Sequence, residues 1–131
     1  MKKPTVVLAD DDRDLLENVQ KLLESEFQVL ACVTDGHKLI EAARLLAPDL
    51  IVTDISMEGL NGIRAARLLK AEQPNARIIF LTVHDESVFV AEARKVGALG
   101  YVIKQSADSD LIPAIREVLQ GRPFVSPAAR Q

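Results

Sequence analysis

The chain has 131 residues, of which 48% are hydrophobic and 27% charged, so it can fill one core and keep a charged surface. Its formal net charge of −3 argues against direct nucleic-acid contact by this segment, because such contact normally needs a basic face. No apolar run reaches the length of a signal peptide's hydrophobic region or of a membrane span, so we expect a cytoplasmic protein without membrane contact.

Short apolar runs alternate with stretches that repeat apolar residues at helical spacing. In chain order, this pattern predicts strand Thr5–Ala9, a helix through Leu15–Leu23, strand Phe27–Val33, a helix through Leu39–Leu46, strand Leu50–Thr53, a helix from Gly62 to before Pro74, strand Arg77–Leu81, a helix over about Glu86–Val96, strand Gly100–Ile103 and helix Ala107–Leu119. Asp12 is the expected N-cap of the first helix. Cys32, the single cysteine, lies in an apolar run and is expected to be a small buried residue.

Strands that alternate with helices favour a mostly parallel sheet with helices on both faces, joined by right-handed crossovers. The sequence therefore predicts one α/β domain over residues 1–121, with a doubly wound five-stranded parallel sheet and five helices. At 122–131 the composition changes to Pro, Ser and Ala, which predicts a linker or tail.

Polar side chains follow the predicted strands at the edge where functional groups of open parallel sheets gather. Asp10 and Asp11 follow the first strand, Asp54 follows the third, Thr82 the fourth and Lys104 the fifth. Three carboxylates held close would repel unless a cation neutralised them, and a hard divalent cation prefers oxygen ligands. A lysine and a hydroxyl beside such a metal suit a phosphoryl group. Asp54 would then be either a metal ligand only or a nucleophile that forms an acyl phosphate.

These positions resemble those of the receiver domains of two-component response regulators, over Thr5 to about Leu119. The resemblance is carried by four stretches: Val-Val-Leu-Ala-Asp10-Asp11, Val-Thr-Asp54-Ile-Ser-Met-Glu-Gly-Leu-Asn-Gly62, Phe-Leu-Thr82 and Gly-Tyr101-Val-Ile-Lys104. It implies a flavodoxin-like receiver fold with strand order 2-1-3-4-5. It also implies a phosphorylation-activated signalling switch, which catalyses its own phosphorylation and dephosphorylation rather than turning over a separate substrate.

The resemblance further implies a role for each polar residue at the carboxyl ends of the strands. Asp54 would be the phosphoacceptor, taking its phosphoryl group from a sensor histidine kinase or a phosphotransfer protein. Asp11, Asp54 and the backbone carbonyl of Ser56 would bind Mg²⁺ or Mn²⁺, and Asp10 would hold the metal through a water. Lys104 would contact the oxygens of the acceptor or of the phosphoryl group.

Two further residues would form the switch. By the resemblance, Thr82 would move toward the phosphoryl group and Tyr101 would turn inward into the vacated space. That repacking would bias the face formed by the fourth helix, fifth strand and fifth helix, which would contact a second copy or an output domain. The tail resembles the junction before a C-terminal helix-turn-helix domain, so control of transcription is the expected output.

Two residues depart from the family pattern, and two more occupy positions that tune it. Glu58 stands where proline is usual, and is either a solvated loop residue or an added negative charge beside the metal. Val83 stands where Ala or Gly is usual, and its size predicts slow phosphorylation by small donors. His84 and Ser56 occupy positions where family members tune water access, with an ordinary surface histidine as the alternative for His84.

Three competing functions differ in what they need from the sequence. An Mg²⁺-dependent aspartyl-phosphate phosphohydrolase usually carries a second acid two residues beyond its nucleophile, where this chain has Ser56. A flavin-binding domain would need a phosphate loop after the first strand, where three aspartates would repel a phosphate. A degenerate receiver that only binds proteins is disfavoured, because every expected acid, hydroxyl and lysine position is filled.

Overall fold

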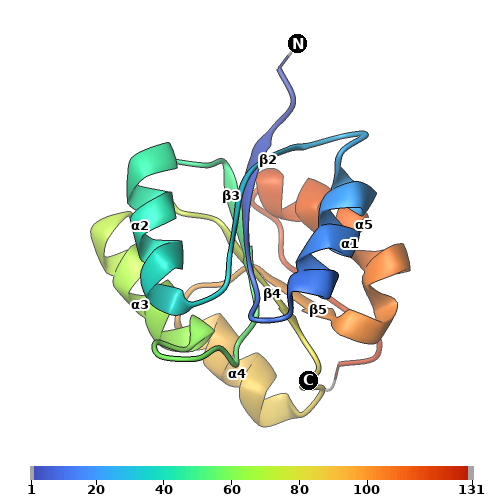
Figure 1. The fold of residues 1–131 in the computed structure, drawn as a ribbon. Coiled ribbons are helices and arrows are strands. Elements are labelled where there is room, and N and C mark those ends of the chain that lie inside the picture. Colours follow the sequence, from blue (N-terminus) through green and yellow to red (C-terminus); the bar gives the residue numbers. More distant parts are fainter. Residues whose placement is uncertain (1, 130–131) are drawn as a thin grey trace.

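The structure is a computed structural model that describes residues 2–129. A parallel sheet runs through the middle of the protein (Figure 1). In the described residues its strands are β1 (Thr5–Ala9), β2 (Gln28–Val33), β3 (Leu50–Thr53), β4 (Ile78–Thr82), β5 (Gly100–Ile103) and β6 (Phe124–Val125). The helices are α1 (Arg13–Leu23), α2 (Gly36–Leu46), α3 (Gly62–Glu72), α4 (Ser87–Lys95) and α5 (Ala107–Leu119), with a short 3₁₀ turn η1 (Lys104–Ser106).

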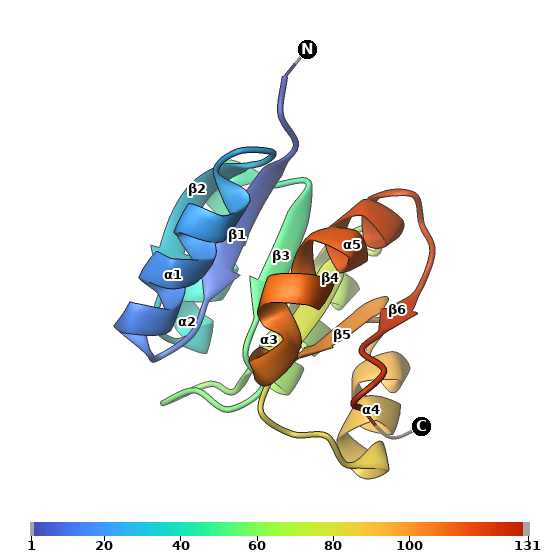
Figure 2. The same cartoon turned by 90° about the vertical axis from the view of Figure 1, so that its right-hand side faces the viewer.

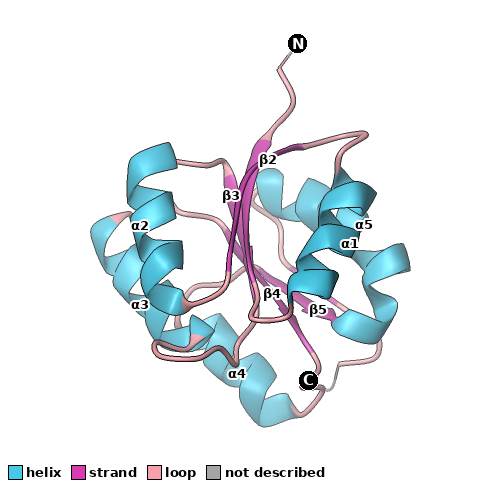
Figure 3. Cartoon of the chain, in the orientation of Figure 1, coloured by secondary structure: helices cyan, strands magenta, loops and turns pink. Residues whose placement is uncertain are grey.

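The strands lie in the order β2-β1-β3-β4-β5-β6, and every neighbouring pair is parallel. The first five strands confirm the expected order 2-1-3-4-5. Because each connection between them carries a helix, strands and helices alternate along the chain (Figure 3). All carboxyl ends of the strands therefore point to the same edge of the sheet.

Helices cover both faces of this sheet. Figure 1 shows the sheet edge-on, with α2 and α3 on one side and α1 and α5 on the other. Side chains alternate along β1 in the same way: Val7 packs into the hydrophobic cluster with α2, α3 and α4, whereas Val6 and Leu8 pack into the cluster with α1 and α5. This alternation explains why the central strands are apolar on both faces. No described helix is long and apolar enough to cross a membrane.

Local capping fixes where several helices begin. The Asp12 carboxylate accepts hydrogen bonds from the backbone N–H groups of Asp14 and Leu15, which confirms the expected cap of α1. Asn61 caps α3 in the same manner. Gly62, the first residue of α3, packs closely against the backbone of Asp54, since a Cβ at Gly62 would lie 1.8 Å from the Asp54 carbonyl oxygen. Only glycine allows this approach of α3 to the loop that carries Asp54.

The structure adds one strand to the five expected and corrects one expectation. Within the described residues, Phe124–Val125 of the expected linker or tail forms a short sixth strand that pairs in parallel with β5. The last two residues of that expected tail, 130–131, lie outside the described part. Cys32 is exposed rather than buried, because β2 forms the edge of the sheet and its pattern of burial is incomplete.

Candidate functional site

The loops that follow β1 and β3 bring three carboxylates together. Asp10, Asp11 and Asp54 each offer an oxygen atom, and these atoms lie within 4.8 Å of one another. Asp10 and Asp54 are buried, whereas Asp11 is exposed. Backbone N–H groups hold the two buried carboxylates: that of Asp12 donates to Asp10 Oδ1 at 2.9 Å, and that of Ile55 donates to Asp54 Oδ1 at 2.7 Å.

Lys104 brings the only positive charge that contacts these carboxylates in the described structure. It is the first residue after β5, and its Nζ lies 2.8 Å from Asp10 Oδ2 and 3.0 Å from Asp54 Oδ2. Its side chain is mostly buried. The ends of three strands thus meet in one ion-paired cluster, formed by Asp10, Asp11, Asp54 and Lys104, which we call the acidic cluster.

Burial and charge raise the pKa of two members of the acidic cluster, Asp10 and Lys104. Burial raises the pKa of Asp10 above its usual range, against the opposing effects of the Lys104 contact and the Asp12 N–H. Burial would lower the pKa of Lys104, but its contacts with Asp10 and Asp54 outweigh this and raise the pKa. Lys104 is therefore charged at neutral pH, and one ammonium faces three carboxyl groups.

The cluster is suited to a hard divalent cation. Asp10 Oδ2 is buried, and its close partner among the described residues is the Lys104 ammonium at 2.8 Å. One ammonium shared by Asp10 and Asp54 does not balance three carboxylates, and a cation would supply the missing positive charge. Mg²⁺ prefers oxygen ligands and is usually bound by one or two carboxylates with waters at its other positions, which this cluster can provide. Asp11, the exposed member, leaves the cluster open toward solvent.

Thr82 and Tyr101 both form a hydrogen bond with the backbone of His84. Thr82 is fully buried at the end of β4, and its Oγ1 accepts a hydrogen bond from the His84 N–H at 3.2 Å. The Tyr101 hydroxyl donates to the His84 carbonyl at 2.7 Å, and its ring is buried. Burial, followed by the negative charges of nearby carboxylates, raises the pKa of Tyr101, so its hydroxyl remains protonated. Both side chains therefore restrain the loop between β4 and α4 through hydrogen bonds to its backbone.

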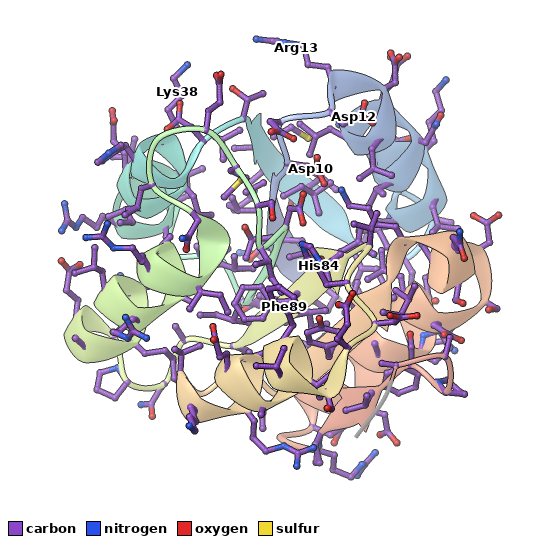
Figure 4. The ribbon with its side chains drawn as sticks, turned by 90° about the horizontal axis from the view of Figure 1, so that it is seen from below. Asp10, Asp12, Arg13, Lys38, His84 and Phe89 are labelled. Atoms are coloured by element: carbon purple, nitrogen blue, oxygen red, sulfur yellow. The ribbon has the colours of Figure 1, made fainter. Side chains whose placement is uncertain are left out.

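The His84 side chain bridges two loops above the cluster. Its Nε2 lies 3.2 Å from Ser56 Oγ, in the loop that follows Asp54. Its ring stacks on Phe89 of α4, with ring centroids 4.2 Å apart and an angle of 18° between the planes (Figure 4). The sequence did not indicate this role of Phe89, because the pairing of the two rings depends on how α4 begins.

The two residues that depart from the expected pattern are both exposed. Val83 is 66% exposed, and Glu58 lies in the loop between β3 and α3. Glu58 lines an open groove of about 500 Å³ together with Asp11, Arg13 and Lys38. In Figure 4, which views this edge of the sheet, Arg13 and Lys38 lie at the periphery while Asp10 and His84 lie near the centre.

The family model of the response regulator receiver domain matches residues 6–116. The chain belongs to this family. The match covers β1 through most of α5, and so includes every member of the acidic cluster as well as Thr82 and Tyr101. Receiver domains are phosphorylation-controlled switches of two-component systems, and this chain is one of them.

Curated relatives of this receiver domain include a transcriptional regulatory protein and a response regulator. It is 35% identical over 127 residues to the transcriptional regulatory protein DegU of Brevibacillus brevis, covering 95% of this chain and 54% of that protein. It is 33% identical over 128 residues to the response regulator GacA of Pseudomonas aeruginosa, covering 95% of this chain and 60% of that protein. The chain therefore spans little more than half the length of these relatives.

Solved receiver structures share the fold along nearly the whole chain. A LuxR-family two-component response regulator from an Aurantimonas species superposes with a TM-score of 0.92 at 33% identity, covering 96% of this chain and 91% of that one. The isolated receiver domain of RcsB from Salmonella enterica, solved with the phosphomimetic BeF₃⁻, gives a TM-score of 0.88 at 27% identity, covering 97% and 96%.

The raised pKa of Asp10 leads to a prediction about stability without metal. When the folded-state pKa of an acid is raised, ionisation is penalised in the fold, so stability falls as pH rises from the ordinary pKa through the raised one. We expect Asp10→Asn to raise the thermal midpoint at pH 7 in EDTA by about 3 °C or more, which corresponds to roughly 1 kcal/mol.

Thermal unfolding followed by circular dichroism measures this effect. Asp12→Asn is the matched control, because it keeps a capping oxygen on an exposed residue and should leave the midpoint nearly unchanged. Added Mg²⁺ should stabilise the wild type and narrow the difference from Asp10→Asn. A midpoint for Asp10→Asn below that of the wild type in EDTA would contradict the argument.

Proposed function

We propose that Asp54 is the phosphoacceptor of this receiver domain and that a sensor histidine kinase or a phosphotransfer protein is the donor. The observation that carries the proposal is the contact of 3.0 Å between Lys104 Nζ and Asp54 Oδ2, made inside a cluster with two more aspartates. A nucleophilic carboxylate beside a fixed positive charge suits attack on a phosphoryl group. The chemistry requires a partner that carries a labile phosphoryl group.

In the proposed reaction, an Asp54 carboxylate oxygen attacks the phosphorus of a phosphohistidine. The new P–O bond forms as the P–N bond breaks, and the leaving imidazole nitrogen keeps the electron pair and takes up a proton. Mg²⁺ or Mn²⁺, held by Asp11, Asp54 and the Ser56 carbonyl and through water by Asp10, would supply positive charge to the phosphoryl oxygens. The Lys104 ammonium already lies at the acceptor and neutralises a second part of that charge.

The switch follows from the shared contact of Thr82 and Tyr101 with His84. If Thr82 Oγ1 turns to donate to a phosphoryl oxygen, it gives up the hydrogen bond from the His84 N–H. The loop between β4 and α4 then loses one of these two hydrogen bonds. A shift of His84 would also displace the Tyr101 hydroxyl, which donates to the His84 carbonyl. Phosphorylation would thereby shift the population between two packings of the α4, β5 and α5 face.

We propose transcription as the output of the parent protein, which would act in the cytoplasm. The curated relatives named above are regulators, and a related RcsB structure at 27% identity and a TM-score of 0.89 is that of a complex with DNA. The α4, β5 and α5 face would contact an output domain or a second copy of the receiver. Residues 122–131 would form the junction that follows the receiver at 1–121, with no nucleic-acid contact by this domain itself.

The central prediction concerns a covalent adduct. With Mg²⁺ and a phosphorylated histidine kinase, intact mass should show one labile phosphoryl group on the wild type and none on Asp54→Ala. Asp12→Asn is the matched control and should take up the group at nearly the wild-type rate, because its side chain caps α1 rather than joining the cluster. EDTA should abolish the adduct.

The alternative functions give different results in the same experiment. A folded protein that binds Mg²⁺ but takes a phosphoryl group from no donor would be a degenerate receiver, and the proposal would be wrong. Sustained turnover of a small phosphate ester, with Asp54→Ala inactive, would instead indicate a phosphohydrolase.

The residues above the cluster are proposed to set the rate of the reaction. The imidazole of His84, bonded to Ser56 and stacked on Phe89, restricts the approach of water and of small donors to Asp54. Val83, on the same loop, narrows the entrance from its exposed position, and Glu58 adds negative charge to the groove beside Asp11.

We expect His84→Ala to speed both phosphorylation by phosphoramidate and hydrolysis of the adduct by about threefold, because it removes the bridge to Ser56. Val83→Ala should have the same direction and a smaller size, since that side chain points largely to solvent. Both rates are measured from intact mass against time. Unchanged or slower rates in His84→Ala would exclude a gating role for the imidazole.

A further inference from the structure

The segment that follows α5 returns to the sheet and lies along β5. Figure 2 shows β6 beside β5 at the edge of the sheet. The Phe124 N–H donates to the Leu99 carbonyl at 3.0 Å, and the Ser126 N–H donates to the Tyr101 carbonyl at 2.8 Å. This segment lies beyond residues 6–116, the part matched by the receiver family.

Ser126 is a buried polar residue whose hydroxyl is fully used. Its side chain is 0% exposed. Ser126 Oγ accepts a hydrogen bond from the Ile103 N–H at 3.1 Å and donates one to Asp110 Oδ2 of α5 at 2.8 Å. The side chain thereby takes the place of a backbone carbonyl as the acceptor for the Ile103 N–H, just beyond the last residue of β6. Without the hydroxyl, a buried N–H and a carboxylate oxygen would both lose their partner.

Ile103, whose N–H donates to Ser126 Oγ, directly precedes Lys104 in the chain. Ile103 is the last residue of β5, and the chain turns into η1 directly after it. Lys104 must leave β5 at the right height and angle to reach Asp10 and Asp54 at 2.8 and 3.0 Å. Ser126 therefore restrains the strand end from which the lysine extends, on the side of β5 opposite to β4.

We propose that Ser126 is a positioning residue for phosphoryl transfer, acting through Lys104. This proposal rests on the proposed function, in which the Lys104 ammonium stabilises charge on the phosphoryl group. Ser126 fixes the Ile103 N–H, this fixes the start of η1, and Lys104 then meets the acceptor in a preorganised geometry. Because coupling is reciprocal, phosphorylation of Asp54 in turn alters the hold of β5 on residues 124–126.

Ser126→Ala tests the proposal against a matched control. Ser109→Ala makes the same change in an exposed serine whose hydroxyl reaches the other oxygen of the same Asp110 carboxylate. With Mg²⁺ and phosphoramidate, at a temperature where all variants are folded, we expect Ser126→Ala to form the adduct about three- to tenfold more slowly than the wild type. Ser109→Ala should stay within about twofold. Amide hydrogen exchange at Ile103 should speed up in Ser126→Ala only.

A double-mutant cycle with Lys104→Ala separates positioning from a general loss of structure. If Ser126 acts through Lys104, Ser126→Ala will have little further effect on the rate once the ammonium is gone. An equal fractional loss in both backgrounds, or a wild-type rate in Ser126→Ala, would overturn the proposal while leaving the phosphoacceptor role of Asp54 intact. No adduct on the wild type would overturn both proposals.

A second variant covers the case in which Ser126→Ala does not fold. Asp110→Ala removes the acceptor of the Ser126 hydroxyl, together with the contact to Ser109 that the Ser109→Ala control also removes, and leaves Ser126 Oγ free to accept from Ile103. The hydroxyl then loses its fixed orientation, so we expect adduct formation to slow by about twofold, again only when Lys104 is present. A wild-type rate in Asp110→Ala would in that case count against the proposal.

Discussion

A single ammonium group holds the functional edge of this domain together. Lys104 Nζ contacts Asp10 and Asp54, two buried carboxylates that would otherwise repel each other in a region of low polarity. The contact requires the ends of β1, β3 and β5 to meet at one edge, which a parallel sheet with crossover helices provides. One ammonium does not balance these two carboxylates, and Asp11 adds a third. The remaining negative charge makes the cluster receptive to a divalent cation and, through it, to a phosphoryl group.

The same arrangement connects the chemistry to the surface. Thr82 and Tyr101 bind the N–H and the carbonyl of one residue, His84, whose ring rests on Phe89 of α4. A change at the acceptor that recruits Thr82 therefore acts on α4 through one short loop. Ser126 would add a second connection, from Lys104 to the strand that closes the sheet beyond β5. Both connections use hydrogen bonds between a side chain and a backbone group, which are directional and tolerate little displacement.

Much of the architecture could be predicted from the sequence, because apolar runs and helical spacing report burial directly. The strand ends located Asp10, Asp54 and Lys104 at one edge, and Asp12 was recognised as a cap from its position alone. The strand order came from the family resemblance, since periodicity does not order strands. The structure adds β6, which is two residues long and follows glycine and proline, and it exposes Cys32 because the sequence does not show which strand forms an edge. The stack of His84 on Phe89 and the burial of Ser126 arise only from tertiary packing.

The most direct test of this account is the affinity of Lys104→Met for Mg²⁺, measured by calorimetry against the wild type. If the ammonium offsets the charge of the carboxylates, its removal leaves a more negative site, and Mg²⁺ should bind several-fold more tightly. Lys95→Met, at the exposed end of α4, makes the same change in net charge and should bind Mg²⁺ as the wild type does. Weaker or unchanged binding in Lys104→Met would contradict the claim that this lysine balances the acidic cluster.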